Sequence, residues 1–147
     1  MREILFRGKR VDNGEWETGF LVIERYQTSE ERFYITDKMT GYHTPILPKT
    51  VGQYTGLTDK NGTKIFEGDI VKYGKGIYEW NKKDWEFEVG IIDFKDGAFI
   101  INDIYSNDGY NELSCLYHEI NYSGKYDSGT LLEVIGNIHD NFELLAG

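Results

Sequence analysis

Two carboxylates near the middle of the chain are the side chains whose spacing best suits chemistry. Glu67 and Asp69 are separated only by Gly68, and on an extended strand they would share a face. A carboxylate pair of this kind can serve as general acid and base or bind a metal ion. The glycine between them favours a turn instead, in which Asp69 accepts backbone hydrogen bonds and Glu67 is solvated. We expect this architectural role and keep a carboxylate-based enzyme as an alternative.

Two other patterns resemble metal or thiol sites but lack residues that such sites need. Asp59–Gly62 is similar to the start of a calcium-binding loop, yet Thr63 and Lys64 occupy the positions that require Asp or Asn and then Gly. Cys115 and His118 could meet on a helix as a nucleophile and its base, whereas on a strand they would face apart. One Cys and three His are too few for a structural zinc site. We therefore predict no catalytic residue, no metal and no cofactor.

A segment in which aromatic and basic residues alternate is the best candidate for contact with another molecule. Aromatic rings set between cations can stack on the bases of single-stranded nucleic acid. The alternative is a hairpin tip whose tryptophans pack on the protein itself or on a partner. The candidate interaction surface consists of Tyr73, Tyr78, Trp80, Lys82, Lys83 and Trp85.

The net charge narrows the choice of partner. The chain has 16 Lys and Arg against 25 Asp and Glu, a formal charge of -9, so nucleic-acid phosphates are repelled unless the cations gather on one face. In the opposite hypothesis the acidic surface mimics DNA and inhibits a DNA-binding protein. The single Cys, together with the lack of any apolar run of about 20 residues, predicts a cytoplasmic protein without membrane contact.

The composition is typical of a mainly β protein. Aromatic residues make up 15% of the chain, Gly occurs 17 times, and Ala occurs only at Ala98 and Ala146. Aromatic and β-branched side chains suit strands, whereas alanine is the residue that helices favour. Frequent glycine indicates many tight turns. We expect strands with at most short helices.

Three Asx-Gly dipeptides between apolar runs predict hairpin turns. Such dipeptides accept the positive φ angles that a tight hairpin turn requires. A further sharp bend is predicted at Gly68 and Asp69, because the apolar pattern is interrupted there and resumes at once. The three hairpin dipeptides are Asn13–Gly14, Asn61–Gly62 and Asp96–Gly97.

Strands are also expected at both ends of the chain. Residues 2–7 alternate in a way that predicts a strand with Ile4 and Phe6 on its apolar face. Residues 131–139 predict a closing strand with a bulge at Gly136. Residues 111–120 carry apolar side chains at helical spacing within a β chain, so both helix and strand stay open there.

These elements predict a chain of two parts. Residues 1–49 are expected to form a small antiparallel β unit. Residues 50–147 are expected to form an SH3-like, strongly bent β-barrel, with glycines at its corners. Closure of the barrel would remove the strand edges that otherwise invite pairing with other chains.

Three blocks of the chain together resemble the YopX family, whose members are encoded by phages and by prophages in bacterial genomes. The resemblance implies a mainly β fold with an SH3-like second part, in a bacterial host or a phage-infected cell, and it carries over no catalytic residue. The last block departs from the family at Phe142, where Pro is usual. The blocks are REILFRGKRVDNGEW from residue 2, TVGQYTGLTDKNGTKIFEGDIVKY from residue 50 and EVIGNIHDNFELL from residue 133.

The function that these features favour is binding rather than catalysis. The 11 Tyr, 8 Phe and 3 Trp supply apolar surface beyond what a small core needs. We expect a non-enzymatic accessory protein of a phage or prophage that binds a macromolecule and self-associates. A protein or a second copy is the expected partner, and nucleic acid, bound by the segment 73–85, is the alternative.

Overall fold

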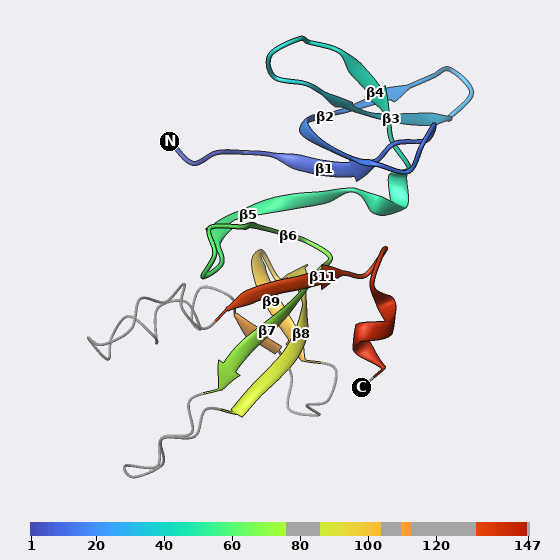
Figure 1. Cartoon of the computed structure of the whole chain (residues 1–147). Helices are drawn as coiled ribbons and strands as arrows, with labels where there is room; N and C mark the ends of the chain where they lie inside the picture. The colour runs from blue at the N-terminus through green and yellow to red at the C-terminus, as the bar shows by residue number, and fades with distance from the viewer. Residues whose placement is uncertain (76–85, 104–109, 113–131, 147) are drawn as a thin grey trace. The chain divides into compact units, whose positions relative to one another are not determined.

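The computed structural model describes residues 1–75, 86–103, 110–112 and 132–146 (Figure 1). It is mainly β, as predicted, and its strands form two antiparallel sheets, in the orders β4-β3-β2-β1-β5-β6 and β10-β9-β8-β7-β11. The first sheet contains β1 (Phe6–Lys9), β2 (Trp16–Arg25), β3 (Glu31–Thr36), β4 (His43–Pro45), β5 (Gly52–Thr58) and β6 (Lys64–Phe66). The second contains β7 (Asp69–Lys75), β8 (Glu86–Lys95), β9 (Ala98–Asp103), β10 (Tyr110–Glu112) and β11 (Glu133–Asn137). Two short 3-10 helices are η1 (Pro48–Thr50) and η3 (Phe142–Leu145).

The chain divides into two compact units. Unit 1 is Met1–Gly56 and unit 2 is Leu57–Gly147. The division falls inside β5, later in the chain than the predicted boundary between residues 49 and 50. The two units are described separately below.

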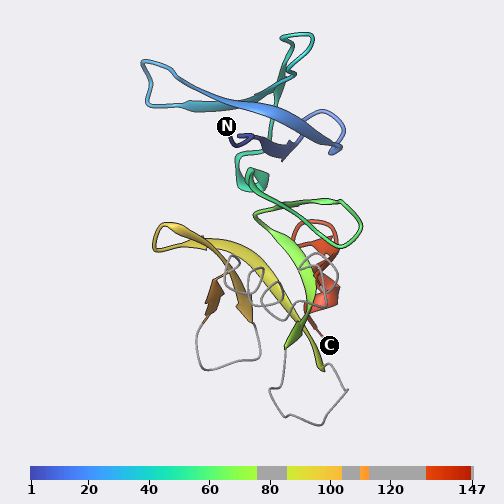
Figure 2. The same ribbon diagram turned by 90° about the vertical axis from the view of Figure 1, so that its left-hand side faces the viewer.

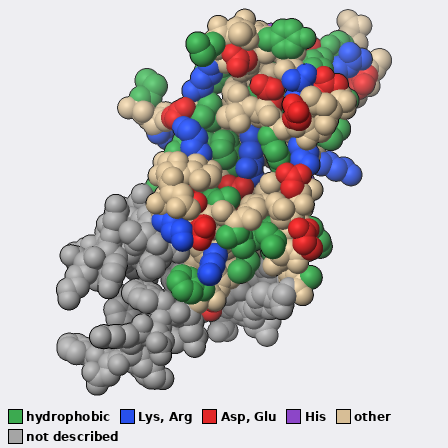
Figure 3. All heavy atoms as spheres, in the orientation of Figure 1, with side chains coloured by type: hydrophobic (Ala, Val, Ile, Leu, Met, Phe, Trp, Pro, Cys, Tyr) green, Lys and Arg blue, Asp and Glu red, His purple; other side chains and the backbone are tan. Residues whose placement is uncertain are grey.

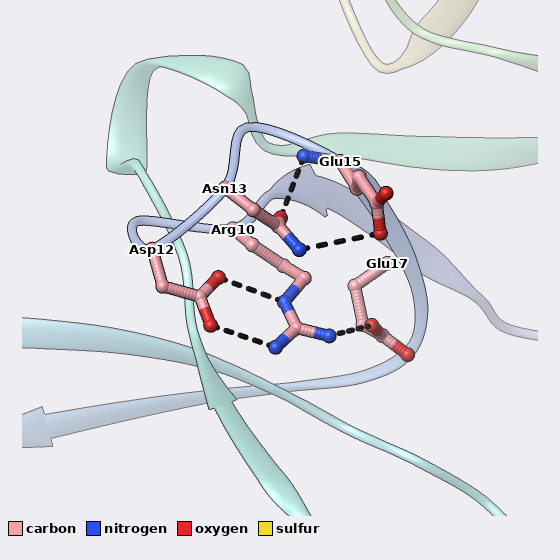
Figure 4. Close-up of polar contacts among 5 residues, drawn as sticks. All are labelled: Arg10, Asp12, Asn13, Glu15 and Glu17. Carbon is pink, nitrogen blue, oxygen red and sulfur yellow. Dashed lines mark hydrogen bonds and ion pairs between the residues drawn. The ribbon is translucent and has the colours of Figure 1, made fainter.

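The turn between β1 and β2 in unit 1 is held by its own side chains (Figure 4). Gly14 has a φ of 71°, the left-handed conformation expected of an Asx-Gly turn. Arg10 donates hydrogen bonds of 2.9 and 2.7 Å to the two carboxylate oxygens of Asp12, and this pairing lowers the pKa of Asp12 below its ordinary value. Asn13 Oδ1 accepts the backbone N–H of Glu15 at 2.9 Å. Local contacts thus hold the loop that sets the register of the hairpin.

Strand β2 changes its partner halfway along. Its residues 16–19 pair with β1, and its residues 20–25 pair with β3. A Cβ atom at Gly19, where the change occurs, would overlap the carbonyl oxygen of Thr36 on β3. Glycine is therefore required for the close approach of β3 at this point.

The buried hydrophobic positions of unit 1 include Leu5, Ile35, Ile46 and Tyr54. Leu5 is buried and Ile4 is exposed, so the prediction that Ile4 faces inward is wrong. The carbonyl of Leu5 accepts the backbone N–H of Tyr54 at 2.8 Å, next to the β1–β5 ladder. The pairing with β5 therefore extends to Leu5, the residue before β1 begins. The inward position is Leu5 and not Ile4, one residue away from the position that simple alternation suggested.

Unit 2 contains a strongly curved sheet (Figure 2). In the turn between β8 and β9, Asp96 and Gly97 have φ angles of 52° and 82°, as in a type I′ hairpin. The register of β11 against β7 shifts between Val134 and Gly136, which is the predicted bulge. The identification of this unit as an SH3-like barrel stays a prediction. Its core cluster consists of Ile65, Val71, Tyr73, Ile92, Ile101 and Leu132.

Some sequence-based expectations fall outside the described residues. Of the segment 111–120, whose helical or strand character was open, only 111–112 are described, and they belong to β10. Cys115 and His118 lie in the part that is not described.

The sharp bend before β7 centres on Gly68, whose φ is +82°. Its N–H donates to the carbonyl of Ile92 at 2.8 Å, and its carbonyl accepts the N–H of Ile138 at 2.9 Å. A Cβ at this position would meet Ile138 at an ordinary distance of 3.6 Å. The requirement for glycine is therefore conformational rather than steric.

Replacing Gly68 by valine is expected to lower the free energy of unfolding by about 1 to 3 kcal/mol, because a branched residue is strained at positive φ. Gly68→Asn is the matched control, since asparagine tolerates the left-handed region and should cost less. Urea denaturation of both variants measures the difference. Equal losses for valine and asparagine would contradict the conformational explanation.

Candidate functional site

The predicted carboxylate pair is part of the architecture of unit 2. Asp69 is only 1% exposed, and its Oδ2 accepts the backbone N–H of Phe66 at 2.8 Å. The carboxylate therefore closes the bend between β6 and β7 around Gly68, as the turn interpretation predicted. Within the described residues, no group of three His, Cys, Asp or Glu side chains could hold a metal ion.

Asp59, which begins the calcium-like stretch, organises its turn and also reaches a distant strand. Its carboxylate is 5% exposed. Oδ1 accepts the backbone N–H groups of Asn61 and Thr63, each at 2.9 Å. Oδ2 accepts the N–H of Val134 on β11, also at 2.9 Å. Both oxygens are thus engaged by backbone donors, which makes Asp59 a link between the β5–β6 turn and β11.

The predicted interaction surface is wrong at its first residue. Tyr73 is 2% exposed and belongs to the core cluster of unit 2, and its hydroxyl donates to Glu88 at 3.0 Å. Its apolar ring fills the core while its polar end finds a partner on the adjacent strand. The other members lie outside the described residues: Tyr78, Trp80, Lys82, Lys83 and Trp85.

Unit 1 instead presents an apolar sheet face. Residues directly opposite each other on paired strands point to the same side of a sheet. In one row across the three strands, Phe20 lies opposite Thr36 and Thr36 lies opposite His43. In the next row on the same side, Val22 lies opposite Tyr34 and Tyr34 lies opposite Pro45. We call these six residues the outer face; it consists of Phe20, Val22, Tyr34, Thr36, His43 and Pro45.

The opposite side of the same three strands faces the interior of unit 1. Ile35 is fully buried, and Thr44 beside it on β4 is also buried. On the outer face, by contrast, Phe20 is 49% exposed, His43 and Pro45 are exposed, and the remaining members are half-buried. A sheet that is apolar on both sides is typical of strands covered on both sides. The outer face is therefore a candidate docking surface.

One end of the outer face is bordered by a cluster of aromatic and charged side chains. The Tyr26 hydroxyl donates to Glu24 at 2.8 Å, and hydrogen bonds with Glu24 and Tyr34 raise the pKa of Tyr26 to about 12. The Arg32 guanidinium lies 4.6 Å from the centre of the Tyr26 ring. Arg32 also pairs with Glu30 at 3.8 Å. This border therefore contains both positively and negatively charged side chains, and they pair with neighbouring groups.

The other end of the outer face is bordered by the loop between β3 and β4. Asp37 Oδ1 accepts the backbone N–H groups of Met39 and Thr40, each at 2.8 Å, and these bonds lower the pKa of Asp37. The ordered loop leaves Met39 and Tyr42 strongly exposed. Apolar surface therefore continues past the strands.

Charge is distributed unequally between the units. Unit 1 contains eight Lys and Arg and eight Asp and Glu, so its formal charge is zero and the -9 of the whole chain belongs to unit 2. The space-filling view shows hydrophobic side chains among side chains of both signs (Figure 3). An apolar core within a charge-balanced border is the usual anatomy of a protein–protein interface.

Comparison with known proteins identifies the family. The family model described as YopX protein matches residues 5–146. The chain belongs to the YopX family. This YopX-family chain is similar to the crystal structure of protein EF1440 from Enterococcus faecalis, with 24% identity, 99% of each chain covered and a TM-score of 0.52. At that identity the likeness shows the fold alone, and no curated protein matches.

A signal for the outer face was present in the sequence. Phe20 to Ile23 are four consecutive apolar residues within β2, a run that indicates a strand buried on both sides. In the described residues, no helix is long and apolar enough to cross a membrane. The outer face is therefore a candidate site in addition to the segment 73–85, most of which lies outside the described residues.

Proposed function

We propose that this YopX-family protein is a non-enzymatic accessory protein of a phage or prophage that binds another protein through the outer face and self-associates. The observation that carries the proposal is the exposure of Phe20 on a sheet whose other side contains the buried Ile35 and Thr44. Exposed aromatic side chains within a polar border are the groups that dominate binding energy at protein interfaces. The hypothesis of a carboxylate enzyme at Glu67 and Asp69 loses support because the buried Asp69 accepts the backbone N–H of Phe66.

A protein fits the outer face better than a nucleic acid does. Nucleic-acid binding requires an excess of cations to displace counterions from phosphates, whereas unit 1 has no net charge. The cation beside Phe20 is also paired, because Lys38, whose ammonium lies 5.5 Å from the centre of the Phe20 ring, pairs with Glu3 at 3.1 Å. The polar border can therefore complement a protein surface of mixed charge.

The test is affinity capture with the full-length tagged chain from cells in which the encoding phage or prophage is active. Wild type is compared with the double variant Phe20→Ser and His43→Ser. Losing the aromatic anchor and the histidine in the same row is expected to weaken binding by about 30-fold or more, since truncating a hot-spot side chain costs about 2 kcal/mol or more.

Phe142→Ser is the matched control, because Phe142 is 69% exposed but lies in unit 2. It should retain the captured protein at the wild-type level. Capture of the same protein in equal amounts by the double variant would contradict the proposal. Thermal unfolding of all three proteins shows whether a loss of capture reflects unfolding instead.

A further inference from the structure

The second half of β2 has one edge without a partner strand. Residues 20–25 pair with β3 on one side, and β1 reaches the other side only as far as Gly19. Backbone groups of successive residues on a strand point alternately to its two edges. The N–H and C=O groups of Leu21, Ile23 and Arg25 therefore belong to the edge opposite β3.

The hydrogen bonds around the strand support this assignment. The N–H of Tyr26 donates to the carbonyl of Glu30 at 3.0 Å, so the even-numbered residue at the end of β2 faces β3. Phe33 lies opposite Ile23, but its carbonyl accepts the N–H of Ile46, just after β4, at 2.9 Å. The backbone of Phe33 therefore faces away from β2. In the described residues, no backbone hydrogen bond engages Leu21, Ile23 or Arg25 on the open edge.

This open edge also lacks the usual protection. Natural edge strands are blocked by proline, lysine, bulges or covering loops. The β4 edge of the same sheet is blocked in this way, because Pro45 has no N–H and its carbonyl accepts the N–H of Val11 at 3.1 Å. On β2 the corresponding positions are Leu21, Ile23 and Arg25; only Arg25 at the end is charged, and the apolar Ile23 is 46% exposed.

We infer that this chain forms a two-fold symmetric dimer in which residues 21–25 of β2 pair antiparallel with the same residues of a second copy. The inference rests on the self-association in the proposed function and names its surface, which is the edge of β2 and not the outer face. A two-fold axis beside Ile23 places Ile23 opposite its own copy and Leu21 opposite Arg25 of the other chain. In this register each copy donates three hydrogen bonds and accepts three, so every open group at these three positions is paired.

Side-chain and charge complementarity favour a second copy as the occupant. An isologous interface must be complementary to itself, and unit 1 has equal numbers of positive and negative side chains. The same register brings Phe20 opposite Tyr26 of the other copy, an aromatic cross-strand pair of a kind that stabilises sheets. It places no two like charges opposite each other within residues 20–25.

Light scattering coupled to size-exclusion chromatography provides the first test. Wild type is expected to have twice the chain mass of 17.0 kDa. Ile23→Lys places two ammonium groups together at the two-fold axis and is expected to give a monomer. The monomeric variant should still bind the outer-face partner, because Ile23 points to the other side of the sheet.

Cysteine cross-linking tests the register, and it does not depend on whether Ile23→Lys folds. In a Cys115→Ser background, Ile23→Cys should give a disulfide-linked dimer on mild oxidation, since Cα atoms of such a pair lie about 5.5 Å apart. Leu21→Cys is the control, because its copy lies about 13 Å away along the strand and should not cross-link.

Each outcome decides between the claims. A wild-type monomer at all concentrations overturns both the edge pairing and self-association, and it leaves the outer-face proposal to the capture experiment. A dimer that persists with Ile23→Lys and forms no Ile23→Cys disulfide overturns the edge pairing alone. Loss of the dimer in Ile23→Lys together with selective cross-linking of Ile23→Cys supports the inference.

Discussion

Replacing Asp59 by alanine is expected to lower the free energy of unfolding by about 3 to 5 kcal/mol. The change removes the acceptor of three backbone hydrogen bonds, from Asn61, Thr63 and Val134. The donors are buried or partly buried, and leaving such a donor unsatisfied costs about 1 to 3 kcal/mol. Because one of the three belongs to β11, the loss should detach the closing strand as well as loosen the turn.

Urea denaturation of matched variants measures this effect. Asp59→Asn retains Oδ1 but replaces the acceptor of the Val134 N–H by a donor, so it should be intermediate. Asp12→Ala is the control for loss of a carboxylate at a turn, since Asp12 is exposed and pairs with Arg10. It should cost less than about 1 kcal/mol. If Asp59→Ala cost no more than Asp12→Ala, Asp59 would not be a link between distant strands.

The second large effect is expected at Gly19. Gly19→Ala places a Cβ against the carbonyl oxygen of Thr36, which is a backbone atom of a paired strand. Relief requires displacement of β3 from β2, so we expect a loss of about 3 kcal/mol or more, at the upper end for overpacking. Denaturation monitored by circular dichroism gives the value.

Gly14→Ala is the comparison for Gly19→Ala. Gly14 has a left-handed conformation, with φ of 71°, but a Cβ there would meet no atom within 4 Å. Its substitution should cost about 1 kcal/mol, from backbone strain alone. A smaller loss for Gly19→Ala than for Gly14→Ala would show that β3 can move away without cost and that the close approach is unimportant.

The local features of the fold could be read from the sequence. The structure has turns at Asn13–Gly14 and Asp96–Gly97, because a tight turn depends on the φ angles that two adjacent residues can adopt. The role of Asp69 was also predictable, since its backbone partner, Phe66, is three residues away. The mainly β class followed from composition in the same way.

Features that depend on tertiary pairing could not be read from the sequence. The partner of Asp59 on β11 is 75 positions away, and no local pattern announces it. The inward position of Leu5 depends on β5, which pairs beside β1. The burial of Tyr73 similarly depends on neighbouring strands, because a tyrosine next to basic residues is consistent with either a surface or a core.

The candidate site was partly visible. The apolar run from Phe20 to Ile23 was in the sequence, but only the ladders show which of these side chains share the outer face and which backbone groups face an open edge. The neutrality of unit 1 could already be counted from the predicted boundary, because residues 50–56 carry no charged side chain. The shared face and the open edge, by contrast, required strand partners that the residues alone do not specify.

The most direct test of the outer face as a protein-binding surface is site-specific photo-cross-linking in cells with the active phage or prophage. A photoreactive phenylalanine analogue replaces Phe20 in one protein and Phe142 in the other, so that both probes are exposed but lie in different units. We predict that position 20 cross-links to a distinct protein other than its own copy and that position 142 does not. No such adduct at position 20, or the same adducts from both positions, would contradict the account.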